Sequence, residues 1–175
     1  VAAAMRELGA VAEAVILCGG PRGESLRNLL EKRGIQYIPV MIEGWTRSNL
    51  HVYDQSTGEQ YRFVMPGPQV DDTDIEKLME TVKHLDPVPD YIVASGSLPP
   101  GAKPETMNTL AMTAQSLGAK LIIDTSGPAL RQAAEAGVYM LKPNMNELKD
   151  LTGTDVSTEA GQEEAMRQLV EEDSC

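Results

Sequence analysis

The sequence is poor in the residues that build metal centres, disulfide frameworks and nucleophile–base pairs. It contains two cysteines, Cys18 and Cys175, and two histidines, His51 and His84. Cys18 follows an apolar run and Cys175 is the last residue, so their placement fits neither a metal site nor a disulfide framework. Two scattered histidines are too few for a metal site or a catalytic triad. We therefore expect reduced thiols and a cytoplasmic protein.

Positive charge and long apolar runs are scarce as well. There are 15 Lys and Arg residues against 26 Asp and Glu residues, a formal net charge of −11. Affinity for nucleic acid depends on cations that neutralise phosphates, so no nucleic-acid partner is expected. No apolar run approaches the roughly 20 residues that span a membrane, so no membrane partner is expected either.

Aromatic residues are few and unevenly placed. The chain has one tryptophan, five tyrosines and one phenylalanine, and five of these residues lie between positions 37 and 63. Tyr61, Phe63 and Met65 alternate with their neighbours, which places them on one face of a strand. The turn-forming segment 54–58 precedes this strand. The pattern predicts an antiparallel hairpin outside the main sheet.

Elsewhere, short apolar runs alternate with amphipathic helical stretches. The runs at 14–17, 91–94, 121–124 and 138–141 read as strands of a mostly parallel sheet flanked by helices, the α/β class. We expect residues 1–34 to begin this α/β domain, 35–67 to form the hairpin and its connecting strands, and 68–175 to continue the domain.

Ligands of such sheets bind beyond the carboxyl ends of the strands. This rule selects the loops 95–101, 124–127 and 142–147. Loop 95–101 could hold an anion or a sugar hydroxyl through its serines and glycines, or could simply connect a strand to a helix. Asp124 could face a ligand or a metal, or could cap the following helix.

Two further candidate ligand-binding sites can also be explained by a purely structural role. Asn144 and Glu147 are three residues apart at a helix start, which suits a hydrated Mg²⁺ and its phosphates, but spacing alone favours a capping box. Arg47 could bind a phosphate monoester through two parallel hydrogen bonds, or could be a surface residue stacked on Trp45.

Taken together, these loops resemble a known family. Ser95–Gly101, Asp124–Gly127 and Lys142–Leu148, in this order, resemble the ribokinase-like (PfkB-type) carbohydrate kinases. Residues 45–52 and 58–67 are similar to the 6-phosphofructokinase branch of that family. The resemblance runs over essentially the whole chain. It implies a ribokinase-like fold in which the aromatic hairpin is a small β-lid that closes over the sugar and pairs with a second subunit to form a homodimer.

The resemblance also implies a reaction and roles for individual residues. The 1-hydroxyl group of fructose 6-phosphate would attack the γ-phosphate of MgATP. Arg47 would contact the 6-phosphate, and Ser97 would line the sugar-phosphate site. Asn144 and Glu147 would lie near the ATP phosphates, and Glu147, together with Asp124 acting through water, would hold Mg²⁺. Fructose 1-phosphate or tagatose 6-phosphate remain alternative substrates.

Two parts of the family pattern are absent from the 175 residues. Family members carry a glycine-rich segment ending in Asn before the position of Val1. They also carry a Gly-Ala-Gly-Asp segment, whose Asp is the general base, after the position of Cys175. We therefore expect an internal fragment that lacks a catalytic base and does not turn over substrate by itself. The alternative from another class is a non-catalytic sugar-phosphate binding module, and the gene sequence beyond Cys175 would distinguish the two.

Overall fold

The computed structural model describes residues 1–171, and Cys175 lies outside them. Contacts within the chain divide it into two compact units. Unit 1 comprises Val1–Leu78 together with Pro99–Ala102, and unit 2 comprises Met79–Leu98 and the chain from Lys103 onward. The division falls within α3 (Asp72–Lys83). The three-part organisation expected from the sequence, with divisions at residues 34 and 67, stays a prediction.

Unit 1 is built on a pair of parallel strands. Its elements before the hairpin are α1 (Ala2–Glu7), β1 (Glu13–Cys18), α2 (Gly20–Lys32) and β2 (Gln36–Met41). The strands pair from Glu13 opposite Gln36 to Cys18 opposite Met41. Parallel strands need a crossover connection, and α2 supplies it. The strand expected at 14–17 is thus present as β1, between two helices.

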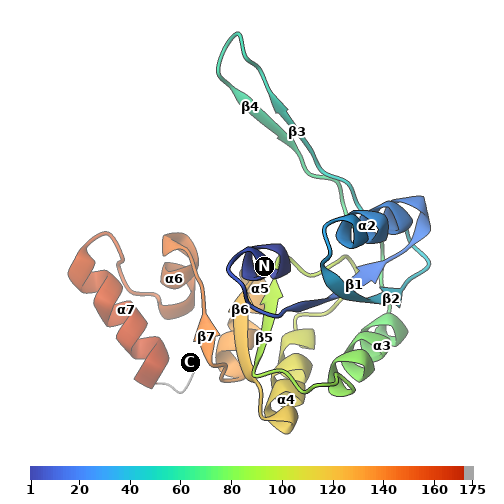
Figure 1. Cartoon of the computed structure of the whole chain (residues 1–175). Coiled ribbons are helices and arrows are strands. Elements are labelled where there is room, and N and C mark those ends of the chain that lie inside the picture. Colours follow the sequence, from blue (N-terminus) through green and yellow to red (C-terminus); the bar gives the residue numbers. More distant parts are fainter. Residues whose placement is uncertain (172–175) are drawn as a thin grey trace. The chain divides into compact units, whose positions relative to one another are not determined.

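The predicted hairpin is also present. Strands β3 (Leu50–Tyr53) and β4 (Gln60–Phe63) pair antiparallel in a two-stranded sheet of their own. All eight residues are exposed, and the hairpin extends away from the strands and helix α2 of unit 1 (Figure 1). At its base, the side-chain oxygen of Asn49 accepts a hydrogen bond from the backbone N–H of Met65, 3.2 Å away.

Unit 2 contains a three-stranded parallel sheet in the order β5-β6-β7. A helix follows each strand, which is the arrangement that the α/β pattern predicts. The elements are β5 (Tyr91–Ser95), α4 (Thr106–Leu117), β6 (Lys120–Asp124), α5 (Gly127–Glu135), β7 (Met140–Leu141), α6 (Met145–Thr152) and α7 (Glu159–Glu171). The carboxyl ends of β5, β6 and β7 therefore share one edge.

The core of unit 2 lies around the central strand. Ile123 of β6 and Ala133 of α5 are fully buried. Leu130 of α5 is only 1% exposed. Burial of a side chain of the size of Ile123 or Leu130 contributes about 1.5–3 kcal/mol. Helices α6 and α7 share a smaller cluster of their own, formed by Leu148, Leu151, Val156, Ala165 and Leu169. Among residues 1–171, no helix is long and apolar enough to cross a lipid bilayer.

Helix α3 is capped by a residue ahead of its first turn. Thr73 and Glu76 have the spacing of a capping box, but α3 begins before them, at Asp72. The carboxylate of Asp71 accepts a hydrogen bond from the backbone N–H of Asp74, 2.9 Å away. Asp71 thus caps the helix, because aspartate is at least as good a cap as threonine and stands one residue ahead of the first turn.

Candidate functional site

Asp124 lies at the carboxyl edge of the sheet, between residues of two neighbouring strands. It pairs in register with Ser95 of β5. The Ser95 hydroxyl donates to Oδ2 of Asp124 at 3.4 Å, and Nζ of Lys142, just beyond β7, lies 3.2 Å from Oδ1. The backbone N–H of Lys142 donates to the carbonyl of Ile123 at 3.0 Å, so the ladder continues to this point. Three adjacent strands thus each place one polar side chain in a single cluster.

The contacts of Asp124 argue against the helix cap that the sequence left open. The cap of α5 is Ser126, and no side chain makes a capping hydrogen bond there. The carboxylate of Asp124 instead contacts a hydroxyl group and an ammonium group that face the end of the sheet. Asp124 therefore does not cap α5, and its role toward a ligand or a metal stays a prediction.

Lys142 belongs to this cluster, although no site role was predicted for it. Its signal was present in the sequence: a basic residue directly after a short apolar strand, at the edge where ligands bind. The side chains of Lys142 and Asp124 are 72% and 40% exposed. Exposed ion pairs of this kind contribute about 0–1 kcal/mol, so the pair adds little stability and both groups remain accessible to a ligand.

Asn144 and Glu147 form the capping box that their spacing favoured. The Asn144 side chain accepts from the N–H groups of Asn146 and Glu147, at 2.9 and 3.1 Å. Oε2 of Glu147 accepts from the N–H of Asn144 at 2.7 Å. The box fixes both side chains at the positively polarised start of α6, where anions are favoured.

The carboxylates available here suit a metal that takes few protein ligands. Across residues 1–171, no group of three or more His, Cys, Asp and Glu side chains is placed to hold a metal ion. Mg²⁺ keeps several waters and is held by one or two carboxylates together with substrate phosphates. The oxygen donors of Asp124 and Glu147 fit that requirement.

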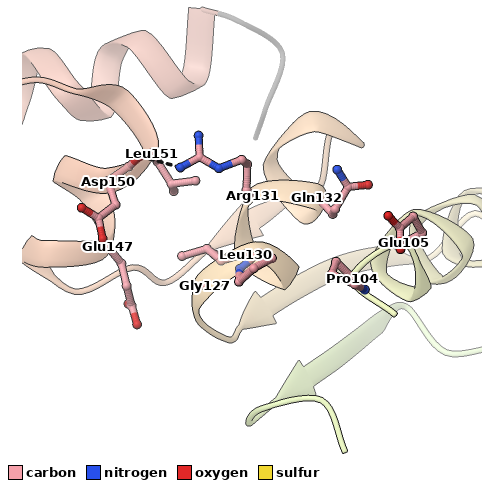
Figure 2. Close-up of a pocket in the computed structure, with 10 residues that line it drawn as sticks. Pro104, Glu105, Gly127, Leu130, Arg131, Gln132, Glu147, Asp150 and Leu151 are labelled. Carbon is pink, nitrogen blue, oxygen red and sulfur yellow. Dashed lines mark hydrogen bonds between the residues drawn. The ribbon is translucent and has the colours of Figure 1, made fainter. Parts of the chain in front are cut away.

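A cavity of about 440 Å³ opens in unit 2 between α5, α6 and the start of α4, and Ser95, Asp124 and Lys142 do not line it. Residues at the starts of three helices line it: Pro104 and Glu105 before α4, Gly127 and Pro128 in α5, and Glu147 in α6 (Figure 2). Leu130 forms an apolar part of the wall. The volume lies within the range of small-molecule sites, roughly 300–1,000 Å³.

Loop 95–101 leaves β5 through a glycine in a left-handed conformation. Gly96 has φ +106°, and its N–H donates to the carbonyl of Asp124 at 2.8 Å. Ser97, which follows it, is exposed. The loop is thus anchored beside Asp124, and the hydroxyl of Ser97 is open to solvent.

Arg47 lies in unit 1, in a segment fixed to the glycines after β1. Gly19 N–H donates to the Thr46 hydroxyl at 3.1 Å, and Thr46 N–H donates to the Gly19 carbonyl at 3.0 Å. A Cβ atom at Gly20 would overlap the ring of Trp45, so only glycine allows this close approach. Gly19 and Gly20 therefore have a packing role.

Arg47 is exposed and does not stack on Trp45. Among the described residues, the cation–π contacts are those of Lys120 with two tyrosines, and none joins Arg47 to Trp45. Cδ of Arg47 lies next to Gly67 instead, and so does Cδ of Pro100. Arg47 thus lies beside the part of loop 95–101 that belongs to unit 1. Ser97, Asp124, Asn144 and Glu147 belong to unit 2.

Comparison with known proteins gives a consistent result. The pfkB family of carbohydrate kinases matches residues 1–173 of the chain. ATP-dependent 6-phosphofructokinase isozyme 2 of Escherichia coli is 38% identical over 171 residues, which cover 97% of this chain and 55% of that protein. A 1-phosphofructokinase of Vibrio cholerae is 32% identical over 171 residues, which cover 98% of this chain and 54% of that protein. The chain spans about half the length of these relatives.

Solved structures match the fold closely. Phosphofructokinase-2 from Escherichia coli in complex with fructose-6-phosphate has a TM-score of 0.91, and the tetrameric inhibited form of that enzyme has a TM-score of 0.92. Each is 36% identical in sequence, and each match covers 99% of this chain and 57% of the solved chain.

Proposed function

Because the chain belongs to the pfkB family of carbohydrate kinases, we propose that it serves the ATP-dependent phosphorylation of fructose 6-phosphate at the 1-hydroxyl group. The observation that carries the proposal is the cluster at the sheet edge. Asp124, supported by Ser95 and Lys142, lies at the edge where the helix start bearing Asn144 and Glu147 also lies. Carboxylates, an ammonium group and a helix start suit a metal–phosphate ligand.

The residues of unit 2 would act on the nucleotide. Glu147, and Asp124 through water, would hold Mg²⁺, which when bound screens the charge of the phosphates. Asn144 would orient the phosphates from the start of α6. The ammonium group of Lys142 would bind a phosphate oxygen as a point charge while keeping Asp124 in place. Phosphoryl transfer depends mainly on such positioning and charge stabilisation.

Arg47 and Ser97 would act on the sugar phosphate. A guanidinium group can bind the 6-phosphate through two parallel hydrogen bonds, and the hydroxyl of Ser97 can donate a hydrogen bond to an oxygen of the sugar phosphate. Arg47 is exposed and is not engaged by Trp45, so its donors are available.

The substrate assignment can be tested by kinetics. We expect the enzyme made from the natural gene to prefer fructose 6-phosphate over fructose 1-phosphate in kcat/KM, and Arg47→Ala to raise KM for fructose 6-phosphate. The matched control is Arg33→Ala, which removes an exposed arginine at the end of α2. A higher kcat/KM for fructose 1-phosphate would favour the 1-phosphofructokinase alternative, to which the similarity with the Vibrio cholerae protein points.

Binding of the sugar phosphate can be measured by the fluorescence of Trp45. Trp45, two residues from Arg47, is the single tryptophan, so its fluorescence reports on this segment. We expect fructose 6-phosphate to change that fluorescence, and Arg47→Ala to abolish the change. An equal response to inorganic sulfate at the same concentration would show an unspecific anion effect.

The hairpin would join two copies of the protein. Its register places Leu50 and Val52 on the same face as Phe63 and Tyr61, and these four side chains are 41–55% exposed. An isolated two-stranded hairpin is marginally stable at best, so an apolar face of this kind is stabilised by burial against a partner. A second copy presents the same apolar face, and we propose a homodimer through the hairpin.

Sedimentation velocity tests the dimer. Phe63→Asp should shift the protein toward monomer. Gln60→Asp adds the same charge on the opposite face of β4 and should leave the dimer intact. Dissociation by both variants, or by neither, would rule out the apolar face as the interface.

A further inference from the structure

The end of helix α6 is capped by a side chain from another helix. The last four carbonyl groups of an α-helix lack partners within the helix. In α6, the carbonyl of Lys149 accepts from Gly153 N–H at 2.7 Å. The carbonyl of Asp150 accepts instead from Nη2 of Arg131 on α5, at 3.0 Å (Figure 2).

Arg131 is well suited to this contact. A guanidinium group carries a permanent positive charge, and positive charge is favourable at the negatively polarised end of a helix. Among residues 1–171, Arg131 forms no ion pair with a carboxylate, although acidic residues line the same cavity. In the described part of the chain, the side-chain hydrogen bond of Arg131 goes to a backbone carbonyl, which is the geometry of a helix cap and not of a surface ion pair.

The position of α6 depends on few contacts. The helix has 8 residues, too few to be stable in isolation, so its placement is set by what it touches. Leu148 and Leu151 join it to the cluster shared with α7. Arg131 joins its last turn to α5, across the cavity that Glu147 also lines.

The two helices linked by Arg131 begin at the proposed metal–phosphate residues. Helix α5 begins at Gly127, three residues after Asp124, and α6 begins directly after Asn144. A link between the body of α5 and the end of α6 therefore restrains the start of one helix relative to the start of the other.

We propose that Arg131 is a positioning residue, which caps α6 and thereby holds Asn144 and Glu147 in place relative to Asp124. The structural part of this proposal stands without the proposed function. Its consequence for magnesium binding rests on that function, so the two parts are tested by separate measurements.

The first test is hydrogen exchange of the α6 amides in the chain. Arg131→Gln removes the charge and shortens the side chain, and it should speed exchange of the amides of residues 149–152 about two- to fivefold, since a solvent-exposed contact between a cation and the end of a helix is lost. Arg131→Lys, which keeps a charged donor, should recover part of the protection. Arg167→Gln is the matched control, because Arg167 is an exposed arginine of α7 paired with Glu164. Unchanged exchange in Arg131→Gln, or no recovery with lysine, would overturn the capping role.

The second test is the magnesium dependence of the enzyme made from the natural gene. Arg131→Gln should raise the Mg²⁺ concentration for half-maximal rate by about two- to fivefold, the factor expected for loss of the same cap. It should leave KM for fructose 6-phosphate unchanged, because Arg131 is not placed at the sugar phosphate. Faster α6 exchange with an unchanged Mg²⁺ requirement would overturn the positioning role. An inactive wild-type enzyme would refute the proposed function, and the exchange result would still decide the capping role.

Discussion

The contact between loop 95–101 and the segment after the hairpin depends on Gly101. Gly101 has φ +91°, and a Cβ atom there would overlap both the carbonyl oxygen of Val70 and the side-chain amide of Gln69. The N–H of Val70 donates to the Pro100 carbonyl at 2.9 Å, and Val70 is only 2% exposed. Gly101→Ala must therefore displace the loop from Val70.

The cost of this substitution can be worked out from its parts. Positive φ costs an alanine about 1–2 kcal/mol. Loss of the hydrogen bond from Val70 to Pro100 adds about 1 kcal/mol, and partial exposure of the Val70 side chain adds about 1.5 kcal/mol. Gly118 offers a matched control, because it has φ +70° at the end of α4 and open space at its Cβ position. Gly118→Ala should cost only the backbone part.

Urea unfolding followed by circular dichroism measures the difference. We expect Gly101→Ala to lower the free energy of unfolding by about 2.5 kcal/mol more than Gly118→Ala does. Because Pro100 also lies beside Gly67 and close to Arg47, the response of Trp45 to fructose 6-phosphate should weaken in the same variant. Equal destabilisation by the two substitutions would refute the close contact between Gly101 and Val70.

Three further predictions concern unit 2. Lys142→Met should change the free energy of unfolding by less than about 1 kcal/mol, because its pair with Asp124 is exposed, yet it should strongly reduce phosphorylation of fructose 6-phosphate in a coupled assay. Asn144→Ala should destabilise α6 by about 1 kcal/mol through loss of the cap, measured by hydrogen exchange, whereas Asn144→Asp should retain it. The backbone N–H of Ser157, and then its hydroxyl, lower the pKa of Asp155. The stability that Asp155 contributes is therefore present above the unfolded-state pKa of about 3.9 and is lost as pH falls through the lower folded-state pKa. In Asp155→Asn, the free energy of unfolding, measured from pH 6 to pH 2, should depend less steeply on pH. An unchanged slope of the free energy of unfolding against pH would contradict the assignment.

Local pattern was enough to predict the elements of this fold. The apolar runs at 14–17, 91–94 and 121–124 became β1, β5 and β6, and the alternating aromatics became β4 of an exposed hairpin. The spacing of Asn144 and Glu147 correctly favoured a capping box, because a cap involves neighbours within one helical turn. At the start of α3 two local signals compete, because Thr73 and Glu76 have the spacing of a capping box, and only the structure shows that Asp71 is the cap.

The tertiary structure decided the contacts between elements. Ser95, Asp124 and Lys142 are separated in sequence by an entire strand–helix unit, and only the parallel register of β5, β6 and β7 brings their side chains together. The hydrogen bond from Arg131 to Asp150 has no local signature for the same reason. Periodicity reports which face of an element is apolar, but the partner of a polar side chain depends on how separate elements pack. The residue types and their loops could therefore be read from the sequence, whereas the contacts that hold Asp124 and α6 could be read only from the fold.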